Sequence, residues 1–521
     1  MTARRRWAAL AVLALPVLLI SVDMTVLGFA VPALSADLQP SGPQLLWIID
    51  IYSFLLAGLL VLMGNVGDRI GRRRLLMIGA AAFGGASVLA AFATSPEMLI
   101  AARALLGLGG ATLMPSTLSL IRTVFPDDRE RRNAIAVWAA SFAGGAALGP
   151  IIGGFLLEHF WWGSVFLINA PIMLLLLVSA FFLLPESRNA NPGPFDLFSA
   201  ALSIAGILPL VYGLKSIGSE GVSLVALVMM ALGGGLLWVF VRRQRQLSEP
   251  LLDIGLFTDR VFSVAVLTNL LSTFSIIGLL FFLPQYLQVV VGLSPLRAGI
   301  WMMPLAVGTI VGSLAAPRLA RMVGLRMIIG GGMLLAAAGF ASGVVLTQTA
   351  PQVGLLIWPA MIGLGIGMAE SLTNDVIVAS APAERTGGAA AISETAYEFG
   401  GAMGTAVLGT LGLAVYRAGL DSAPVSVPEA AIESGGETLG GVSAAVAGLP
   451  PQVADAFIDV ANTAFTNGMS VVLAVATAVM AYTGIQALIV LRTRPADRAL
   501  TTAQEQIAEP EPAEPAEQMV P

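Results

Sequence analysis

Long apolar runs recur along the whole chain, and they limit the possible folds more than any other feature. The first run begins within MTARRRWAALAVLALPVLLISV. A helix of about twenty such residues crosses a hydrocarbon core of ~30 Å. Lipid offers no partner for backbone N–H and C=O groups, so spanning segments are helices or closed barrels. Because these runs lack the alternation of barrel strands, the sequence predicts an all-α polytopic membrane protein.

We expect fourteen spans, which puts both termini on one side of the membrane. If both termini are cytoplasmic, only Lys215, Arg297 and Arg417 of the 27 Lys and Arg residues lie on the outer side of the membrane. Arg103 lies within a span, and all the others lie on the cytoplasmic side, as the positive-inside rule requires. We therefore expect a multi-pass protein of the cytoplasmic (inner) membrane of a bacterium, with its first span retained. The expected spans are 8–32, 44–63, 75–93, 98–121, 133–157, 162–184, 196–214, 222–241, 261–290, 295–316, 326–346, 353–380, 386–415 and 469–491.

The residue content excludes several kinds of chemistry. Only 11% of residues are charged, against roughly 25% in soluble domains. The chain has no cysteine and a single histidine, His159, which excludes thiolate sites, a histidine metal cluster and a Ser/His relay. Its glycine clusters lack the Lys-Ser/Thr of a nucleotide-binding P-loop. We expect no enzyme activity, metal, cofactor or nucleic-acid partner.

Two polar segments lie outside the expected spans. The outer loop 416–468 contains VADAFIDVANTAFTNG, in which Val453, Phe457, Val460 and Phe465 share one helical stripe. This spacing favours a short helix on the membrane or at the outer mouth, although a solvated loop without function fits equally well. The tail 492–521 ends in EQIAEPEPAEPAEQMVP, a composition typical of disorder.

Charged residues within the expected spans are candidate functional sites, because a charge near the bilayer centre costs at least ~2.5–3.5 kcal/mol. By helical rise, Asp23, Asp50 and Arg103 all fall in the outer half of the membrane. They predict a partly buried Asp/Arg cluster that exchanges protons, and a static ion pair joining helices is the alternative. The full set is Asp23, Asp50, Arg103, Glu370, Asp375, Glu394 and Glu398.

Glu394 and Glu398 form the second candidate site, near the midplane of span 13. They are four residues apart and lie on one helix face, where two ionised carboxylates repel each other. The pair therefore predicts a proton or cation site, with a water-lined pocket that does not turn over as the alternative. Glu370 and Asp375 fall near the inner end of span 12, and a purely structural role fits Asp375 equally well.

Aromatic and methionine side chains could line a cavity for a lipophilic cation, because aromatic faces attract cations. Packing against lipid or neighbouring helices is the alternative for each of them. The candidates are Trp47, Tyr52, Phe54, Trp138, Phe142, Tyr286, Trp301, Met302, Met303, Trp358 and Tyr397.

Several motifs resemble the drug:proton antiporters of the major facilitator superfamily, in particular the fourteen-span branch with QacA-type and LfrA-type exporters. GNVGDRIGRRRLL is similar to the loop between spans 2 and 3 of that superfamily, through Gly64, Asp68, Arg69, Gly71, Arg72 and Arg73. The glycines allow two spans to pack tightly, and the resemblance implies a conformational latch. A basic loop that only fixes orientation is the alternative.

Other stretches extend this resemblance over all fourteen spans. RALLGLGGA places Arg103 as in the buried arginine motif of the family, and DMTVLGFAVP and HFWWGSVFLINAP resemble the fourteen-span branch. GAALGPIIGG resembles the antiporter motif; its small residues permit close helix contact and its proline removes a backbone bond. The antiporter motif residues are Gly145, Gly149, Pro150, Gly153 and Gly154.

The resemblance implies an architecture of two six-helix bundles with two inserted helices. We expect bundles at 1–184 and 261–491, an inserted two-helix segment with its linker at 185–260, and the disordered tail at 492–521. We call GNVGDRIGRRRLL the opening motif. APRLARMVGLR, between spans 10 and 11, occupies its place in the second bundle but lacks its Asp.

The resemblance also implies proton-coupled efflux by alternating access. Asp23 matches the span 1 acid of the branch, and Glu394 and Glu398 match its span 13 acids. Thr309 and Ser393 stand where some relatives carry further acids, which favours monovalent cations over dications. We expect lipophilic cationic drugs, dyes and quaternary ammonium compounds, together with protons and membrane lipid, as the partners of a protein that works as a monomer.

Other functions stay open at this point. An exporter of a narrow endogenous lipid or antibiotic product would use the same fold. An importer or symporter would be expected to lack GAALGPIIGG. A membrane enzyme lacks its catalytic residues here, and a sensor or scaffold would not explain acids at depth in the membrane.

Overall fold

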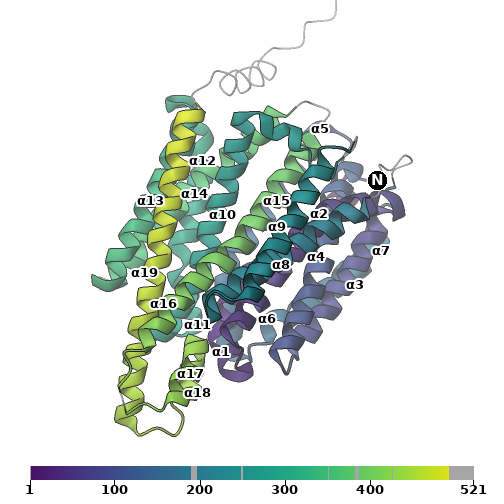
Figure 1. Ribbon diagram of the computed structural model, residues 1–521. Coiled ribbons are helices and arrows are strands. Elements are labelled where there is room, and N and C mark those ends of the chain that lie inside the picture. Colours follow the sequence, from purple (N-terminus) through teal and green to yellow (C-terminus); the bar gives the residue numbers. More distant parts are fainter. Residues whose placement is uncertain are drawn as a thin grey trace, which may run out of the picture.

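The computed structural model describes residues 2–188, 196–247, 250–349, 351–381, 386–424 and 426–491, and these form helices without strands. Fourteen of the helical segments are long and apolar enough to cross a membrane, which confirms the expected fold class and number of spans. Figure 1 shows them as one bundle of long helices. The tail 492–521, predicted to be disordered, and residues 189–195 of the expected linker lie outside the described residues.

The helices before the inserted pair come first in the chain. They are α1 (Ala3–Leu38), α2 (Gly42–Ile70), α3 (Arg72–Ala91), α4 (Pro96–Val124), α5 (Asp128–His159), α6 (Ser164–Leu167) and α7 (Asn169–Leu183). The inserted pair is α8 (Leu197–Glu220) and α9 (Leu224–Gln244), followed by the 3₁₀ helix η1 (Ile254–Thr258).

The remaining helices follow η1, and two π-helical turns, η2 and η4, continue spanning helices. They are α10 (Arg260–Gln285), η2 (Tyr286–Val290), α11 (Pro295–Trp301), α12 (Met303–Val323), α13 (Leu325–Thr349), α14 (Pro351–Ser380), α15 (Thr386–Gly404), η4 (Thr405–Gly409), α16 (Thr410–Leu420), α17 (Glu429–Glu437), η5 (Leu439–Gly441), α18 (Val442–Ala445) and α19 (Pro451–Val490).

Local sequence explains where several helices begin and end. Ser41 and Gln44 form a capping box at the start of α2, with a proline in the first turn. The hydroxyl of Ser95 accepts a hydrogen bond from the first turn of α4 in the same way. Gly71 and Gly324 end α2 and α12 with φ of 108° and 89°, a conformation that glycine adopts without a steric penalty. The two glycines occupy corresponding places in the two halves.

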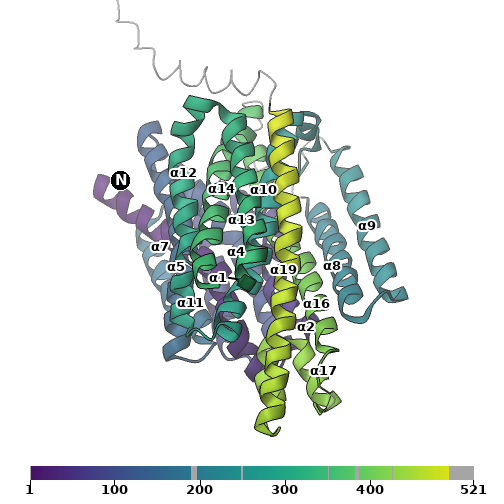
Figure 2. The same cartoon turned by 90° about the vertical axis from the view of Figure 1, so that its left-hand side faces the viewer.

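The two halves of the chain repeat one packing pattern. In residues 2–188, α1 packs on α5, α2 on α4, and α3 on both α4 and α7. In residues 260–491, α10 packs on α15, α12 on α14, and α13 on both α14 and α19. We call these the N-terminal and C-terminal units. The inserted helices α8 and α9 pack on each other, and α8 also contacts α2 and α16, so the pair lies at one side of the bundle (Figure 2).

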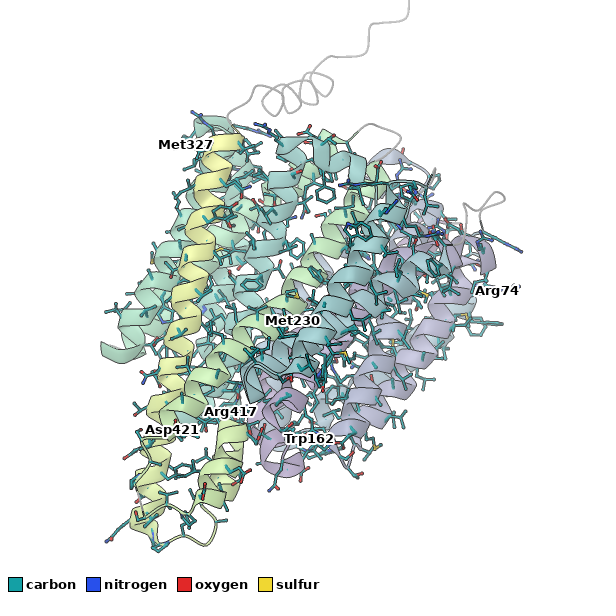
Figure 3. All side chains as sticks on the ribbon, viewed as in Figure 1. Arg74, Trp162, Met230, Met327, Arg417 and Asp421 are labelled. Carbon is teal, nitrogen blue, oxygen red and sulfur yellow. The ribbon has the colours of Figure 1, made fainter. Side chains whose placement is uncertain are left out.

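The bundle has two ends, which we name by what they carry. The terminal side carries the N-terminus, Arg74 and Met327, and the far side carries Trp162, Arg417 and Asp421 (Figure 3). Hydrogen bonds join the two units at the far side. Nε2 of Gln288 donates to the carbonyl of Phe29 at 3.1 Å, and Glu158 accepts from Ser294 at 3.0 Å and from the Leu296 amide at 3.2 Å.

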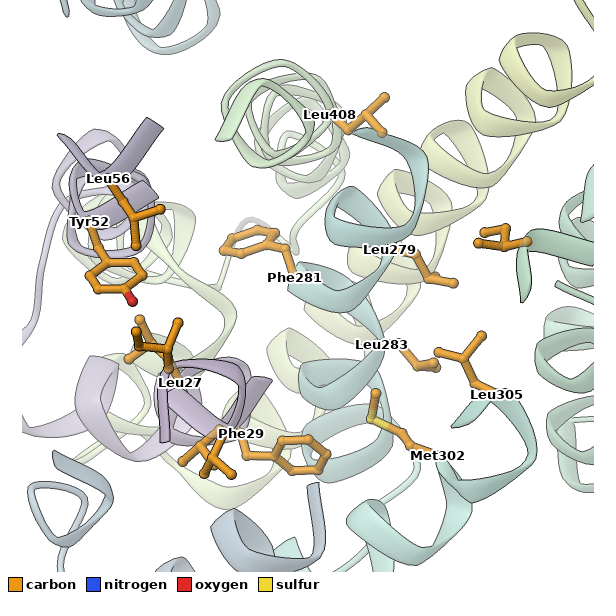
Figure 4. Packing of buried hydrophobic residues seen from close by; sticks show 14 of the residues in the cluster. Leu27, Phe29, Tyr52, Leu56, Leu279, Phe281, Leu283, Met302, Leu305 and Leu408 are labelled. Carbon is orange, nitrogen blue, oxygen red and sulfur yellow. The ribbon is translucent and has the colours of Figure 1, made fainter. Parts of the chain in front are cut away.

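An apolar core runs through both units and across their boundary. Phe29 and Leu27 of α1 are buried, as are Phe281 and Leu283 of α10, and Figure 4 shows α1 and α10 next to each other in this core. Gly28 sits where a Cβ atom would come within 3.0 Å of the Leu280 carbonyl oxygen, so the two helices approach closely. This contact holds the first helices of the two units together near the far side.

The end of the chain differs from the prediction. We expected a short helix within 416–468 and a separate last span at 469–491, whereas α19 runs without a break over Pro451–Val490. The predicted stripe is its first part: Phe465 is buried, with its ring centroid 5.4 Å from that of Phe282, and Phe457 is buried beside Gly435. The stripe therefore packs on protein, because α16 and α17 cover it.

Candidate functional site

The first charged site joins α1 to α4. Nη1 of Arg103 donates to Oδ2 of Asp23 at 2.6 Å, and both side chains are 2% exposed. Nδ2 of Asn169, in α7, donates to the other Asp23 oxygen at 3.4 Å and to the hydroxyl of Ser87 at 3.3 Å. Asp23 is therefore neutralised by a guanidinium and held by an amide from a third helix.

Arg103 has further partners on α2, which explain how a buried guanidinium is accommodated. Its Nε donates to the carbonyl of Ile48 at 3.0 Å, and its Nη2 reaches the carbonyl of Ile49 at 3.4 Å. Its Cζ lies 4.5 Å from the centroid of the Tyr52 ring. The aromatic face and the carbonyl groups supply the polar contacts that water would otherwise give.

The second charged site joins α2 to the inserted helix α8. Oδ2 of Asp50 lies 2.9 Å from Nζ of Lys215, and both side chains are 1% exposed. Nζ also lies 4.1 Å from the ring centroid of Trp47. The expected cluster of three charges is therefore only half right: Arg103 pairs with Asp23, whereas the partner of Asp50 is Lys215.

The sequence analysis missed Lys215 because it ended span 7 at residue 214 and counted the lysine as an outer residue. The structure continues α8 to Glu220 and buries Lys215. A signal was available, since Ile217 extends the apolar pattern beyond the lysine. One further helical turn would have placed Lys215 inside the membrane, where a buried cation requires an acidic partner.

The third charged site lies in the C-terminal unit. Glu398 is 4% exposed and its Oε2 atom is buried without a hydrogen-bond partner in the described residues, while Glu394, one turn earlier in α15, is half-buried. Glu370 of α14 accepts a 2.6 Å hydrogen bond from the hydroxyl of Ser272. None of these three carboxylates forms an ion pair with a described residue. Asp375, also on α14, is exposed.

An amide and hydroxyl network adjoins these acids, and the sequence analysis did not find it. Nδ2 of Asn269, in α10, lies 3.0 Å from Oδ1 of Asn374 and 3.1 Å from Oγ of Ser393. Ser393 in turn donates to Asn374 at 2.7 Å, and the hydroxyl of Thr373 donates to Asn269. Neutral groups thus join α10, α14 and α15. Isolated Asn, Ser and Thr residues give no periodic signal in an apolar run, so only the fold brings them together.

The opening motif forms the turn between α2 and α3 on the terminal side. Gly64, Asp68 and Arg69 lie in α2, Gly71 forms the turn, and Arg72 begins α3 and pairs with Asp68.

The segment after α7 covers this turn. The amide of Arg73 donates to Oε1 of Glu186 at 3.1 Å, and the amide of Arg72 donates to the Ser187 carbonyl at 2.8 Å. A Cβ atom on Gly71 would come within 2.6 Å of Glu186. Two structural reasons therefore favour glycine at position 71, its positive φ and this close approach.

The antiporter motif lies on α5 and contacts both units. A Cβ atom on Gly145 would lie 2.5 Å from the Leu18 carbonyl oxygen, and one on Gly149 would overlap the Thr25 hydroxyl. Gly153 packs on Val26 in the same way, so three glycines permit the contact with α1.

The other end of the motif reaches the C-terminal unit. Gly154 packs against the backbone of Pro295 and Leu296, and the carbonyl of Pro150 lies 2.3 Å from where a Cβ atom on Gly299 would be. The motif therefore brings α5 close to α1 and to α11.

Six of the eleven candidate aromatic and methionine residues have the following surroundings in the structure. Trp47 and Tyr52 stack on Lys215 and Arg103. The hydroxyl of Tyr286 donates to the Thr347 carbonyl at 3.3 Å. The other three are Phe142, whose carbonyl accepts a 2.6 Å hydrogen bond from Ser21, Trp301, half-buried against the core, and Tyr397, half-buried on α15 between Glu394 and Glu398. A substrate role for these residues stays a prediction.

The described residues also show whether a metal ion could bind. They contain no group of three or more His, Cys, Asp or Glu side chains that could hold a metal ion.

Fourteen membrane helices in two units of equal design, with buried acids on helices near the boundary between the units, define the architecture of a membrane transporter. The chain belongs to the Major Facilitator Superfamily, whose family profile matches residues 13–405. Members of this family are transporters, and the protein is a multi-pass membrane protein of this kind.

Two similar proteins are named as a multidrug efflux pump and a resistance protein. The chain is 47% identical to the multidrug efflux pump LfrA of Mycolicibacterium smegmatis over 90% of this chain and 93% of the relative. It is 39% identical to the methyl viologen resistance protein SmvA of Salmonella typhimurium over 90% of this chain and 95% of the relative. A bacterial homologue of the lysosomal transporter Spinster has the same fold, with a TM-score of 0.65 at 15% identity over 95% of this chain and 99% of that one.

Proposed function

We propose that this protein exports lipophilic organic cations, such as dyes and quaternary ammonium compounds, in exchange for protons. The observation that carries the proposal is Glu398, which is 4% exposed, lies one turn from Glu394 and forms no ion pair with a described residue. A carboxylate buried in this way is stabilised by binding a proton or a cation. The names of the relatives, a multidrug efflux pump and a methyl viologen resistance protein, support export of drugs.

The charge state of the two units supports a division of roles between their acids. Asp23 and Asp50 already have cationic partners at 2.6 and 2.9 Å, so neither requires a proton or a substrate to balance its charge. Glu394 and Glu398 have none among the described residues. We therefore place proton and cation coupling first at Glu394 and Glu398, with Asp23 and Arg103 joining α1 to α4 and Asp50 joining α2 to the inserted helix α8 in this conformation.

We assign the terminal side to the cytoplasm, in the inner membrane of a bacterium. Arg72, Arg73 and Arg74 lie there, as the positive-inside rule predicts for cytoplasmic loops. The hydrogen bonds between the units at the far side then correspond to a state closed to the outside. In this scheme residues 1–184 and 261–491 are the two rocking bundles, 185–260 is the inserted segment, and a single chain transports.

The cycle follows from competition for the same carboxylates. A lipophilic cation enters from the cytoplasm and binds near Glu394 and Glu398. The units then rock, and the contacts between α5 and α11 at the far side separate, which opens the far side. Protons from outside neutralise the carboxylates and release the cation. Exchange is coupled because a site that held both charges would bury excess positive charge.

The neutral residues Thr309 and Ser393 bear on the charge of the substrate. Methyl viologen is a dication, and the relative named as a methyl viologen resistance protein is 39% identical to this chain. Here Thr309 and Ser393 stand at positions where an acid would add a second negative charge. We therefore propose monovalent cations as the preferred substrates, and methyl viologen as a poor one.

Ethidium efflux from energised cells tests the proposal. Wild-type cells should expel ethidium, and a protonophore should abolish the efflux. Glu398→Gln should lower the initial rate about a hundredfold, which corresponds to the ~2.5–3.5 kcal/mol scale of a charge in the membrane. Glu433→Gln, which alters an exposed acid of α17, is the matched control and should transport normally.

Two outcomes would contradict the proposal. Efflux that survives collapse of the proton gradient would exclude proton coupling. Absence of ethidium efflux at normal expression would favour the alternative, export of a narrow endogenous lipid or antibiotic product.

A further inference from the structure

The surroundings of Lys215 have the chemistry of a site for an organic ammonium ion. The side chain of lysine ends in an alkylammonium group, and two kinds of group bind such ions well, an aromatic face and a carboxylate. Here the ammonium nitrogen lies 4.1 Å from the ring centroid of Trp47 and 2.9 Å from Oδ2 of Asp50. We call Trp47 and Asp50 the ammonium cage.

The cage and its occupant come from different segments of the chain. Trp47 and Asp50 lie one turn apart on α2, in the N-terminal unit, and Lys215 is carried by the inserted helix α8. The π-helical turn η4 of the C-terminal unit packs against both α2 and α8. The site is therefore at a junction of all three segments, where a relative movement of the units changes its surroundings.

Burial of the charged lysine at this place costs free energy, which a purely structural role does not explain. Both charged side chains are 1% exposed, and an apolar pair of similar volume usually stabilises a fold at least as well as a buried ion pair. Near the pair, Phe54, Val211 and Ala406 are buried in one apolar cluster, and the buried hydroxyl of Thr405 hydrogen-bonds Asp50. The ion pair therefore lies beside an apolar contact.

Lys215 also borders a small cleft between α2, α8 and α16. The cleft is lined by Gly42, Pro43, Leu46, Lys215, Thr410, Leu413 and Arg417. Arg417 is engaged with Glu437 at 2.9 Å. Lys215 therefore lines this cleft on the side that faces α16, at the far side of the bundle.

We propose that the ammonium cage of Trp47 and Asp50 is a binding site for an organic ammonium cation, which Lys215 occupies as a tethered substitute in this conformation. This inference rests on the proposed function, since it supplies a second cation site for the same export. Lys215 fills the cage and keeps Asp50 neutralised while no substrate cation is there. A substrate cation gains access when Lys215 withdraws, so the lysine sets how tightly cations bind.

Binding of ethidium to the purified full-length protein, followed by fluorescence anisotropy without a proton gradient, tests this proposal. Lys215→Met removes the competing ammonium group and should lower the Kd for ethidium about tenfold, within the range of a desolvated cation–aromatic contact plus a carboxylate. Lys215→Arg keeps a cation in place and should retain the wild-type Kd.

Two controls separate the cage from a general change in charge or stability. In the double variant Asp50→Asn/Lys215→Met no unpaired charge is left, and the gain in affinity should disappear. Arg243→Met removes another cation of the inserted pair, which lies 5.1 Å from the Phe198 ring and 3.1 Å from Asp196, and it should leave the Kd unchanged. A gain that persists in the double variant, or a Lys215→Met Kd equal to or above that of the wild type, would overturn the proposal.

A variant on the other side of the cage covers the case in which Lys215→Met does not fold. Trp47→Leu should weaken ethidium binding several-fold, and Trp47→Phe should restore most of it. Equal affinities of Trp47→Leu and the wild type would overturn the proposal. Because no gradient is used, failure of proton coupling leaves this test intact, whereas a wild-type protein that binds no ethidium would count against the proposed function and the cage together.

Discussion

The N-terminal and C-terminal units share their packing and differ in how they treat buried acids. In the N-terminal unit, Asp23 and Asp50 each face a cation, Arg103 or Lys215. In the C-terminal unit, Glu370 accepts a hydrogen bond from the Ser272 hydroxyl, and Glu370, Glu394 and Glu398 form no ion pair with a described residue. Equal architecture therefore does not imply equal chemistry: one unit is balanced in charge, and the other keeps carboxylates that a proton or a cation can balance.

Removing a cation from the balanced unit should have the largest effect on stability. Arg103→Met leaves Asp23 buried without its partner and should lower stability by ~3–5 kcal/mol, the usual effect of breaking a buried pair. Asp23→Asn/Arg103→Met leaves no charge and should recover most of the loss. The measurement is the thermal unfolding midpoint in detergent. Equal midpoints for both variants would show that the charge balance does not stabilise this unit.

Glycine substitutions should affect both units alike, since they test the shared packing. Gly145→Ala and Gly404→Ala each place a Cβ atom within 2.5 and 2.2 Å of a backbone carbonyl oxygen on the neighbouring helix. We expect each to cost ~1–3 kcal/mol. Gly144→Ala meets nothing within 4 Å and should be neutral in the same unfolding assay. A loss in only one unit would show that the packing is less symmetric than the contacts indicate.

Neutralising an acid of the C-terminal unit should act in the opposite direction. Glu398→Gln removes a buried charge without an ionic partner, so stability should stay constant or rise by about 1 kcal/mol while transport is lost. Unfolding midpoints of Glu398→Gln and the wild type, compared in one detergent, measure this. A large destabilisation would mean that the carboxylate of Glu398 has a stabilising partner and that the contrast between the units is wrong.

The smallest expected effect on stability concerns Asp196, which lies just before the inserted helix α8 and pairs with Arg243 of α9. Burial opposes ionisation of Asp196, but hydrogen bonds from Ser199 and the ion pair with Arg243 outweigh it and hold the pKa of Asp196 below its usual value. A lowered pKa in the folded state stabilises the protein above the unfolded pKa of about 3.9, and this contribution is lost as the pH falls through the folded value.

Because Arg243 is 37% exposed, Asp196→Asn should cost less than ~1 kcal/mol at pH 7. The difference in unfolding midpoint from the wild type should shrink near pH 3. A difference that stays constant with pH would show that the carboxylate charge is not what stabilises this contact.

Much of the fold could be predicted from the sequence because membrane spans depend on length and hydropathy alone. All fourteen spans were found, with ends that differ from the structure by up to seven residues in either direction, apart from the start of the last span, which lies eighteen residues earlier than expected. That helix was divided because the polar residues Asp455 and Asp459 interrupt the apolar run. Contacts with α16 and α17 hold the polar part helical, and a window of hydropathy contains no information about such contacts.

The candidate site was predicted less completely, because it too depends on contacts between helices. Helical rise placed Asp23, Asp50 and Arg103 at similar depth, but depth does not say which helices are neighbours. Asp50 faces α8, a helix that lies outside the two repeated units, so the repeat gave no indication of Lys215. Glu394 and Glu398 were predicted together because four residues on one helix fix their relation without any tertiary contact.

The long helix α19 has a practical consequence for work on this protein. Forty residues correspond to about 60 Å, roughly twice the hydrocarbon core, so its first part stands outside the membrane together with α17 and α18. Glu437, in α17 of this outer part, accepts a hydrogen bond from the Gly42 amide at 2.6 Å and pairs with Arg417. The outer part of the C-terminal unit therefore contacts the start of α2 in the N-terminal unit. If the far side faces outward as proposed, an antibody fragment that binds across this contact would hold the far side closed and inhibit transport. The same rigid projection would serve as an alignment mark for electron microscopy.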